Sequence, residues 1–117
     1  MREDIIFHIT TKAYFNSHKK SHEYVPESLD TEGFIHSSKG DQVEATANRI
    51  FAEETQLLLL VIDVSTLTSE VKYEQDESSG ETYPHIYGPI NIDAIMDKLD
   101  IHAEKSGEFK IAFSSNT

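Results

Sequence analysis

Residues 56–64 read QLLLLVIDV, and this stretch decides how the chain folds. Its apolar core, residues 57–62, is too short to cross a bilayer, because a membrane-spanning helix needs about 20 apolar residues. A short continuous apolar run is typical of a strand that is covered on both faces. We therefore expect residues 56–64 to form the central strand of a sheet.

The N-terminal segment predicts a second strand. Residues 4–9 read DIIFHI. Successive side chains of a strand point to opposite faces, so Phe7 and Ile9 share one face while Ile6 and His8 share the other. This strand places a histidine on an otherwise apolar face.

Two helices are expected, each preceded by hydroxyl residues that can cap its N-terminus. Thr10 and Thr11 precede a short helix over residues 12–19. Ser38 begins a second helix that runs to about Glu53, in which apolar residues recur with helical spacing.

The remaining segments predict short strands and loops. They are a loop over 22–32, strands over 34–36, 71–74 and 82–88, an acidic loop over 76–81, and a final hairpin that turns at 105–108. Pro84 confines its strand to an edge or a bulge, because proline lacks the N–H that a central strand donates. Residues 92–102 fit both a helix and a strand. Two helices and six or seven strands make an α+β fold, which we expect to be a single domain over residues 1–117.

The composition excludes some classes of function. The chain has 21 Asp and Glu against 10 Lys and Arg, which gives a net charge of −11. Nucleic-acid binding relies on Lys and Arg that neutralise phosphates, so nucleic acid is not the expected partner. The absence of cysteine excludes disulfides and thiolate metal ligands. Because the N-terminal residues lack a signal-peptide pattern, we expect a cytoplasmic protein that does not contact membranes.

Three of the six histidines share one local pattern, in which a hydroxyl residue follows two positions later. The pairs are His8 with Thr10, His36 with Ser38, and His85 with Tyr87. Residues i and i+2 of a strand share a face, so the three imidazoles meet in one polar patch if their strands are neighbours. We expect the histidines to contact a ligand directly, the three hydroxyl residues to orient it, and Tyr24 to stack on it.

Three chemistries fit such a patch, and the residues leave all three open. Ser37, Ser38, Lys39 and Gly40 lie at a helix start, where free N–H groups and the helix dipole attract phosphate. Three histidines are also a ligand set of catalytic zinc, although we assign no metal ligand. Alternatively, one imidazole acts as a general acid or base.

Several phrases resemble a bacterial family known as domain of unknown function 952. They are IFHIT at 6–10, YVPESL at 24–29, EGFIHSS at 32–38 and PHIYGPIN at 84–91, and with LLLLVID and VKYE the resemblance covers about residues 4–112. The family in turn resembles a compact ADP-ribosyltransferase-like fold with a mixed or antiparallel sheet and two short helices. The cofactor stays unknown, but this resemblance makes NAD a candidate and would place its nicotinamide-side ribose at His8.

The same resemblance exposes one departure. ADP-ribosyltransferases carry a catalytic glutamate on a late strand, where this chain has His85. Glu74 and Glu81 are the carboxylates that would have to replace it in space. The sequence thus predicts a small-molecule partner of nucleotide or ADP-ribose type. A non-catalytic binding module and a three-histidine metal protein are the alternatives, and turnover, substrate and oligomeric state stay open.

Overall fold

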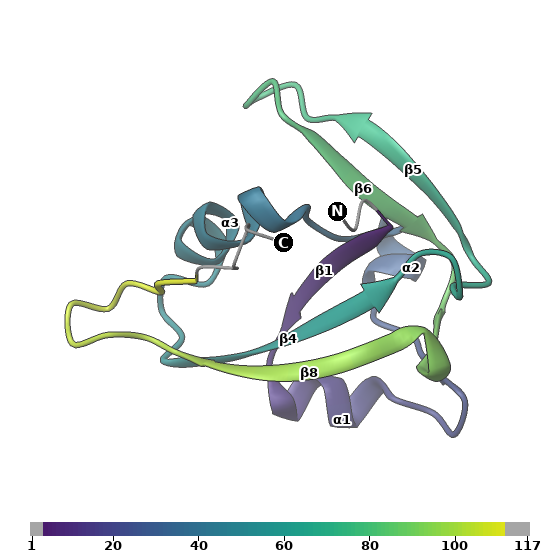
Figure 1. Cartoon of the computed structure of the whole chain (residues 1–117), viewed down its shortest axis with the longest axis horizontal. Helices are drawn as coiled ribbons and strands as arrows, with labels where there is room; N and C mark the ends of the chain where they lie inside the picture. Colours follow the sequence, from purple (N-terminus) through teal and green to yellow (C-terminus); the bar gives the residue numbers. More distant parts are fainter. Residues whose placement is uncertain (1–3, 112–117) are drawn as a thin grey trace.

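The strand predicted from residues 56–64 is the central strand of a sheet. The computed structural model describes residues 4–111. In it, β4 (Gln56–Asp63) pairs antiparallel with β1 (Ile5–Thr10) on one side and β8 (Ile95–His102) on the other (Figure 1). The prediction for this strand is confirmed.

Three α-helices, two 3-10 helices (η) and five more strands complete the described residues. They are α1 (Lys12–His18), β2 (Glu23–Tyr24), α2 (Ser28–Thr31), β3 (Ile35–His36), η1 (Gly40–Gln42), α3 (Val43–Ile50), β5 (Glu70–Gln75), β6 (Thr82–Tyr87), β7 (Ile90–Asn91) and η2 (Ile92–Ala94). All paired strands are antiparallel in this part of the chain. The α+β class predicted from the sequence is confirmed.

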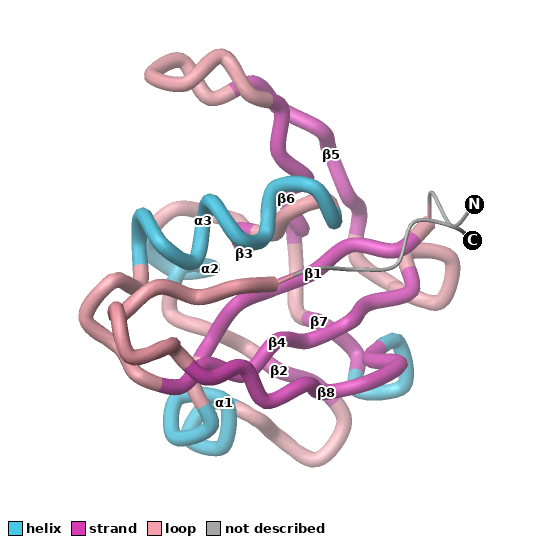
Figure 2. The backbone as a smooth tube through the Cα atoms, turned by 60° about the vertical axis from the view of Figure 1, so that its left-hand side comes forward, coloured by secondary structure: helices cyan, strands magenta, loops and turns pink. Residues whose placement is uncertain are grey.

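Each face of the central sheet contributes to its own hydrophobic core. On one face Leu60 of β4 belongs to a cluster with Phe15 of α1 and with Tyr24. On the other face Leu59 belongs to a cluster with Val43 of α3. Figure 2 shows α1 and α3 on opposite sides of this sheet. Burial on both faces explains why β4 is apolar at nearly every position.

A second sheet has the order β3–β6–β5 and contains two of the three patterned histidines. Its register places His36 of β3 directly opposite His85 of β6. The expectation that Pro84 confines its strand to an edge is wrong, because β6 lies in the middle. The Pro84 carbonyl accepts a hydrogen bond from Ser37 N–H at 3.1 Å, on the β3 side. N and O of one strand residue point to the same side, so the missing N–H faces short β3 and the pairing with β5 is unaffected.

The segment after β3 joins the two sheets. Phe7 and Ser38 form a β-bridge in which Phe7 N–H donates to Ser38 O at 2.9 Å and Ser38 N–H donates to Phe7 O at 2.7 Å. Ser38 therefore does not cap a helix, contrary to expectation. The chain first forms η1, and α3 then ends at Ile50, before the predicted Glu53. By contrast, Thr11 caps α1 as predicted, since its hydroxyl accepts from Tyr14 N–H at 3.2 Å.

Two other predictions need correction, and one open alternative is decided. The loop predicted over 22–32 contains β2 and the short helix α2. The ambiguous segment 92–102 is mostly strand, as η2 followed by β8. No final hairpin strand forms after the turn at 105–108 within the described residues, because Phe109 is buried in a core and its N–H and C=O bond to the side chain of Asn48.

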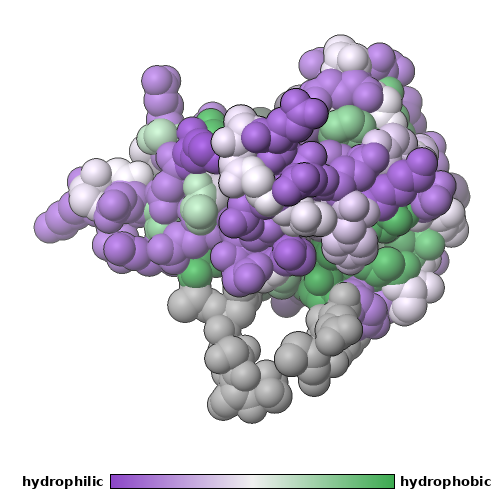
Figure 3. Space-filling view, turned by 90° about the horizontal axis from the view of Figure 1, so that it is seen from above, coloured by the Kyte–Doolittle hydropathy of each residue, from purple (hydrophilic) through white to green (hydrophobic). Residues whose placement is uncertain are grey.

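The surface reflects the acidic composition. Figure 3 shows one face covered largely by hydrophilic side chains, with hydrophobic residues gathered toward one side. Among residues 4–111, no helix is long and apolar enough to cross a membrane.

Candidate functional site

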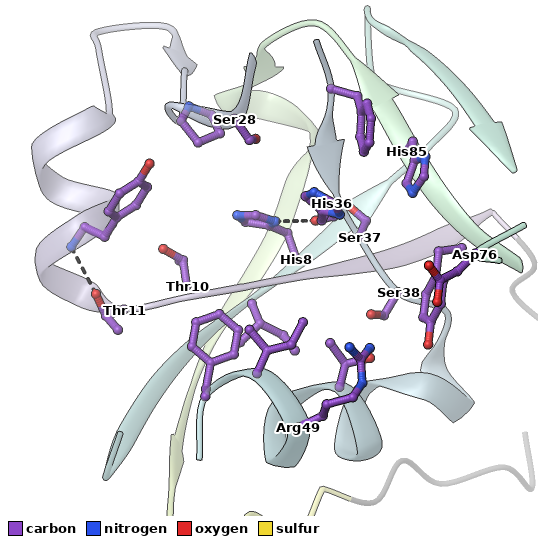
Figure 4. Close-up of a pocket in the computed structure, with 18 of the residues that line it drawn as sticks. His8, Thr10, Thr11, Ser28, His36, Ser37, Ser38, Arg49, Asp76 and His85 are labelled. Carbon is purple, nitrogen blue, oxygen red and sulfur yellow. Dashed lines mark hydrogen bonds between the residues drawn. The ribbon is translucent and has the colours of Figure 1, made fainter. Parts of the chain in front are cut away.

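An open cleft of about 860 Å³ lies where β1, the segment 36–38, β6 and α3 come together. Its volume falls within the range of roughly 300–1,000 Å³ that is usual for small-molecule sites. His8, His36 and His85 all line it (Figure 4). The three strands are thus close enough for the patterned histidines to face one cavity, as the sequence argument required.

His8 is a buried, internally bonded member of this cleft. Its side chain is on β1 and the residue is 9% exposed. A carbonyl can only accept, so Nδ1–H donates to the His36 carbonyl at 2.7 Å, and the Tyr24 hydroxyl lies 3.2 Å from Nε2. Desolvation by burial lowers the pKa of His8 to about 4. His8 is therefore neutral at pH 7, and both ring nitrogens have protein partners.

His36 and His85 line the cleft together with Phe34. Their ring centroids are 5.6 Å apart in an edge-to-face arrangement, and Phe34 stacks on His85 at 4.1 Å. We call Phe34, His36 and His85 the aromatic wall. In this wall the apolar ring of Phe34 lies beside the two imidazoles.

Carboxylates fix both imidazoles of the aromatic wall. His85 Nδ1 lies 2.6 Å from Glu74 Oε1, and the Tyr87 hydroxyl donates to the same oxygen at 2.5 Å. These hydrogen bonds, first from Tyr87 and then from His85, lower the pKa of Glu74. Glu74 is therefore ionised at pH 7 and holds the proton of His85 on Nδ1, which leaves Nε2 of the neutral ring as an acceptor. Similarly, His36 Nε2 lies 2.8 Å from Glu32 Oε1.

Of the two glutamates considered from the sequence, the structure brings Glu74 to His85. Glu74 is on β5, diagonal to His85 across the β5–β6 ladder, since His85 pairs with Lys72. Glu81 instead accepts from the Gln42 side chain at 3.2 Å. Residues 76–81 connect β5 to β6 as an antiparallel hairpin, so this short connection is the sequence signal that could have placed Glu74 near His85.

The residues expected to orient a ligand divide into two groups. Thr10 and Ser38 line the cleft, whereas Lys39 and Tyr87 are not among its described lining residues. Lys39 is exposed, and Tyr87 is engaged by Glu74. Tyr24 borders the cleft but is 0% exposed, with Phe15 packed against its ring at 5.0 Å. It has no exposed ring face for stacking on a ligand and serves as a partner of His8 instead.

The anion site expected at the start of the second helix is not formed by backbone groups. Ser37 N–H donates to Pro84 O at 3.1 Å and Ser38 N–H donates to Phe7 O at 2.7 Å. Lys39 N–H donates to the Gln42 side chain at 3.0 Å. These three N–H groups bond within the protein, two of them to carbonyls of β6 and β1 and the third in the capping box of η1.

Two hydroxyls beside the cleft lack internal partners. Within the described part of the chain, Ser37 Oγ and Thr46 Oγ1 are buried and have no hydrogen-bond partner, and both residues line the cleft. Arg49, one turn beyond Thr46 on α3, lines it too. The sequence argument missed Thr46 and Arg49. Their i, i+3 spacing on one helix face is the signal that could have found them.

The three-histidine metal alternative does not match this geometry. Within residues 4–111, no three His, Asp or Glu side chains are grouped so as to hold a metal ion. His8 donates Nδ1–H to a carbonyl, while His36 and His85 each direct a nitrogen to a carboxylate. Nitrogens engaged in this way do not point at a common centre.

Comparisons with known proteins place the chain beside other proteins without an assigned function. Residues 9–98 match the model of a family described as "Protein of unknown function (DUF952)", which confirms the family resemblance seen in the sequence. The crystal structure of protein CC0527 from Caulobacter crescentus has a TM-score of 0.79 and 25% identity, covering 91% of this chain and 93% of that chain. Its solution NMR structure has a TM-score of 0.73 and 25% identity, covering 90% of each chain. No curated protein sequence matches.

Proposed function

We propose that this chain, which belongs to the DUF952 family of proteins of unknown function, binds or acts on a nucleotide- or ADP-ribose-like phosphorylated small molecule in the cleft. The observation that carries the proposal is the combination, in one cavity of about 860 Å³, of two carboxylate-paired imidazoles and two buried hydroxyls without internal partners. A largely apolar cavity with a few convergent polar groups is the usual form of a small-molecule site.

The aromatic wall suits a flat heterocyclic ring. Phe34 already stacks on His85, and aromatic rings attract one another in offset and edge-to-face arrangements. Sugar hydroxyls that follow such a ring would find hydrogen-bond acceptors on the imidazoles and on the carboxylates of Asp76 and Glu77, which also line the cleft. Ring, sugar and phosphate together are what a nucleotide presents.

His85 is the group that we propose for proton transfer. Glu74 holds its Nδ1 at 2.6 Å, so the lone pair of the neutral ring is on Nε2. A carboxylate that orients an imidazole in this way is a recurring feature of general bases. His85 would take a proton from a hydroxyl of the ligand, and Glu74 would stabilise the resulting imidazolium.

The same arrangement argues against conventional protein ADP-ribosylation. In the ADP-ribosyltransferase-like fold, which stays a prediction for this chain, a glutamate acts directly on the ribose. Here one Glu74 oxygen is shared by His85 and Tyr87. Its bonds to both groups favour a role through His85.

A non-catalytic binding module is the second candidate, and His8 favours it. Protein groups engage both His8 nitrogens and burial keeps the ring neutral, so His8 has no free nitrogen for acid–base chemistry on a ligand. Incubation with NAD followed by product analysis separates the two candidates. Release of nicotinamide that is lost in His85→Gln supports an enzyme, whereas binding without turnover supports the module.

The first test is an NMR titration of isotope-labelled protein with NAD and with ADP-ribose. We expect shifts of residues 36–38 and of the His85 ring, and a much weaker response in His85→Gln. His102→Gln is the matched control, since His102 is exposed on β8 and is not among the residues that line the cleft. Shifts that spare the aromatic wall, or equal affinity for both variants, would contradict the proposal.

A further inference from the structure

We propose that Ser37, Ser38, Thr46 and Arg49 form a subsite for the phosphate groups of the ligand. We call these four residues the hydroxyl–arginine cluster. The inference rests on the proposed function in one respect, since it says where the phosphates of a nucleotide-like ligand bind. The cluster itself is a separate observation, because it lies outside the aromatic wall and uses none of the histidines.

The buried hydroxyls are the first argument. Ser37 is 5% exposed and lines the cleft, yet its Oγ has no partner among the described residues. Thr46 Oγ1 is in the same situation. Buried polar side chains in folded proteins are nearly always hydrogen-bonded, so these two hydroxyls beside the cleft have unused hydrogen-bonding capacity.

The position of the four residues is the second argument. Hydrogen bonds to Pro84 and Phe7 hold the backbone of Ser37 and Ser38 in place. Thr46 and Arg49 are three positions apart on α3 and therefore share one face of that helix. Figure 4 shows the side chain of Arg49 extending from α3 toward Ser38, with Ser37 farther along the same segment.

Charge is the third argument. Among the described residues that line the cleft, Arg49 is the one Arg or Lys. A guanidinium presents several N–H donors in a plane that matches two phosphate oxygens, and hydroxyls donate to the remaining oxygens. Asp76 and Glu77 line the cleft too, and hydrogen bonds from Ser78 and Ser79, with a smaller contribution from the Arg49 charge, lower the pKa of Asp76. The ionised Asp76 repels a phosphate, so Arg49 is the group that must offset this repulsion.

A structural role for Arg49 predicts something different. Arg49 lies in the last turn of α3, where a positive charge also stabilises the helix dipole. A residue that only stabilised the helix would change the melting temperature without changing affinity for phosphate. The test therefore records the melting temperature of each variant as well as its affinity for pyrophosphate.

The experiment is a titration of labelled protein with pyrophosphate at constant ionic strength, using chloride as the reference anion. We expect shifts at residues 37–38 and 46–49. Arg49→Gln should weaken pyrophosphate binding about tenfold, as loss of a charge-assisted hydrogen bond implies, and Thr46→Val should weaken it about threefold. Lys39→Gln is the matched control, because it removes one exposed positive charge from outside the cleft and should leave affinity unchanged.

The possible outcomes separate this inference from the proposed function. Equal pyrophosphate affinity in Arg49→Gln and Lys39→Gln, with both variants folded, overturns the subsite. ADP-ribose that shifts the aromatic wall but binds Arg49→Gln as tightly as wild type overturns the subsite and keeps the proposed function. Pyrophosphate that needs Arg49, without any response of the wall to NAD or ADP-ribose, supports the subsite and contradicts the nucleotide proposal.

Discussion

His8 and His85 line the same cleft, and their surroundings in the protein differ. His8 is 9% exposed, donates to a backbone carbonyl and has its pKa lowered to about 4 by burial. The His85 side chain is 16% exposed and lies 2.6 Å from the ionised carboxylate of Glu74. The same residue type is thus a neutral structural group on β1 and a carboxylate-oriented group on β6. The difference shows that the partner of each ring nitrogen decides what a histidine can do.

The largest expected effect is on the His8 side. His8→Ala removes a buried ring and leaves the His36 carbonyl and the Tyr24 hydroxyl without that partner. We expect the free energy of unfolding to fall by about 3–4 kcal/mol, because the cost of the cavity adds to the cost of the unsatisfied polar groups. Urea denaturation measures this free energy. His102→Ala, at an exposed position, is the control, and its free energy of unfolding should change by no more than about 0.5 kcal/mol. A loss below about 1 kcal/mol would show that His8 is not a structural group.

Acidification should lower the free energy of unfolding through His8 by almost as much as His8→Ala does. Its pKa in the folded state is about 4, below the usual 6.5, so the unfolded state binds more protons between these two values. Stability should be complete above pH 6.5 and fall by about 3 kcal/mol as the pH drops to 4, at about 1.4 kcal/mol per pH unit. The difference between wild type and His8→Gln isolates this contribution. His102→Gln should keep the wild-type dependence, and an unchanged dependence in His8→Gln would refute the assignment.

A smaller effect is expected from Tyr24→Phe. The hydroxyl of Tyr24 lies 3.2 Å from His8 Nε2 and 3.4 Å from Thr10 Oγ1, while the ring is fully buried. Removing one buried hydroxyl while keeping the ring should cost about 1–2 kcal/mol in the free energy of unfolding. Tyr73→Phe, at a half-exposed position, is the matched control. Equal unfolding midpoints for the two variants would show that Tyr24 contributes through its ring alone.

The smallest stability change is expected on the His85 side, where the effect is chemical. Glu74→Gln replaces a partly exposed carboxylate by an amide of the same shape, and stability should change little, because ion pairs near the surface contribute little. An amide can donate as well as accept, so it no longer requires the proton of His85 to be on Nδ1. Nitrogen NMR of the imidazole should show mixed tautomers in Glu74→Gln and a single tautomer in wild type. Mixed tautomers in both proteins would mean that Glu74 does not orient His85.

Patterns within a few residues of sequence predicted part of the site and missed the rest. The repeated spacing of histidine and hydroxyl identified His8, His36 and His85, and all three line the cleft. The same reasoning misjudged Ser38 and Tyr24, and it missed Arg49. Their surroundings depend on segments far away in the sequence: Ser38 bonds to Phe7, and Tyr24 is enclosed by the core on which the cleft is built.

The sequence by itself determined the elements whose signal is periodicity. An apolar run made β4 the central strand, alternation assigned the two faces of β1, and Thr11 marked the start of α1. These features depend on side-chain directions and on hydrogen bonds between residues that are close together in the sequence. Only the tertiary structure decided that His8 is neutral, that Glu74 reaches His85 and that two hydroxyls lack partners. Those properties depend on burial and on register between distant strands, and local spacing contains neither.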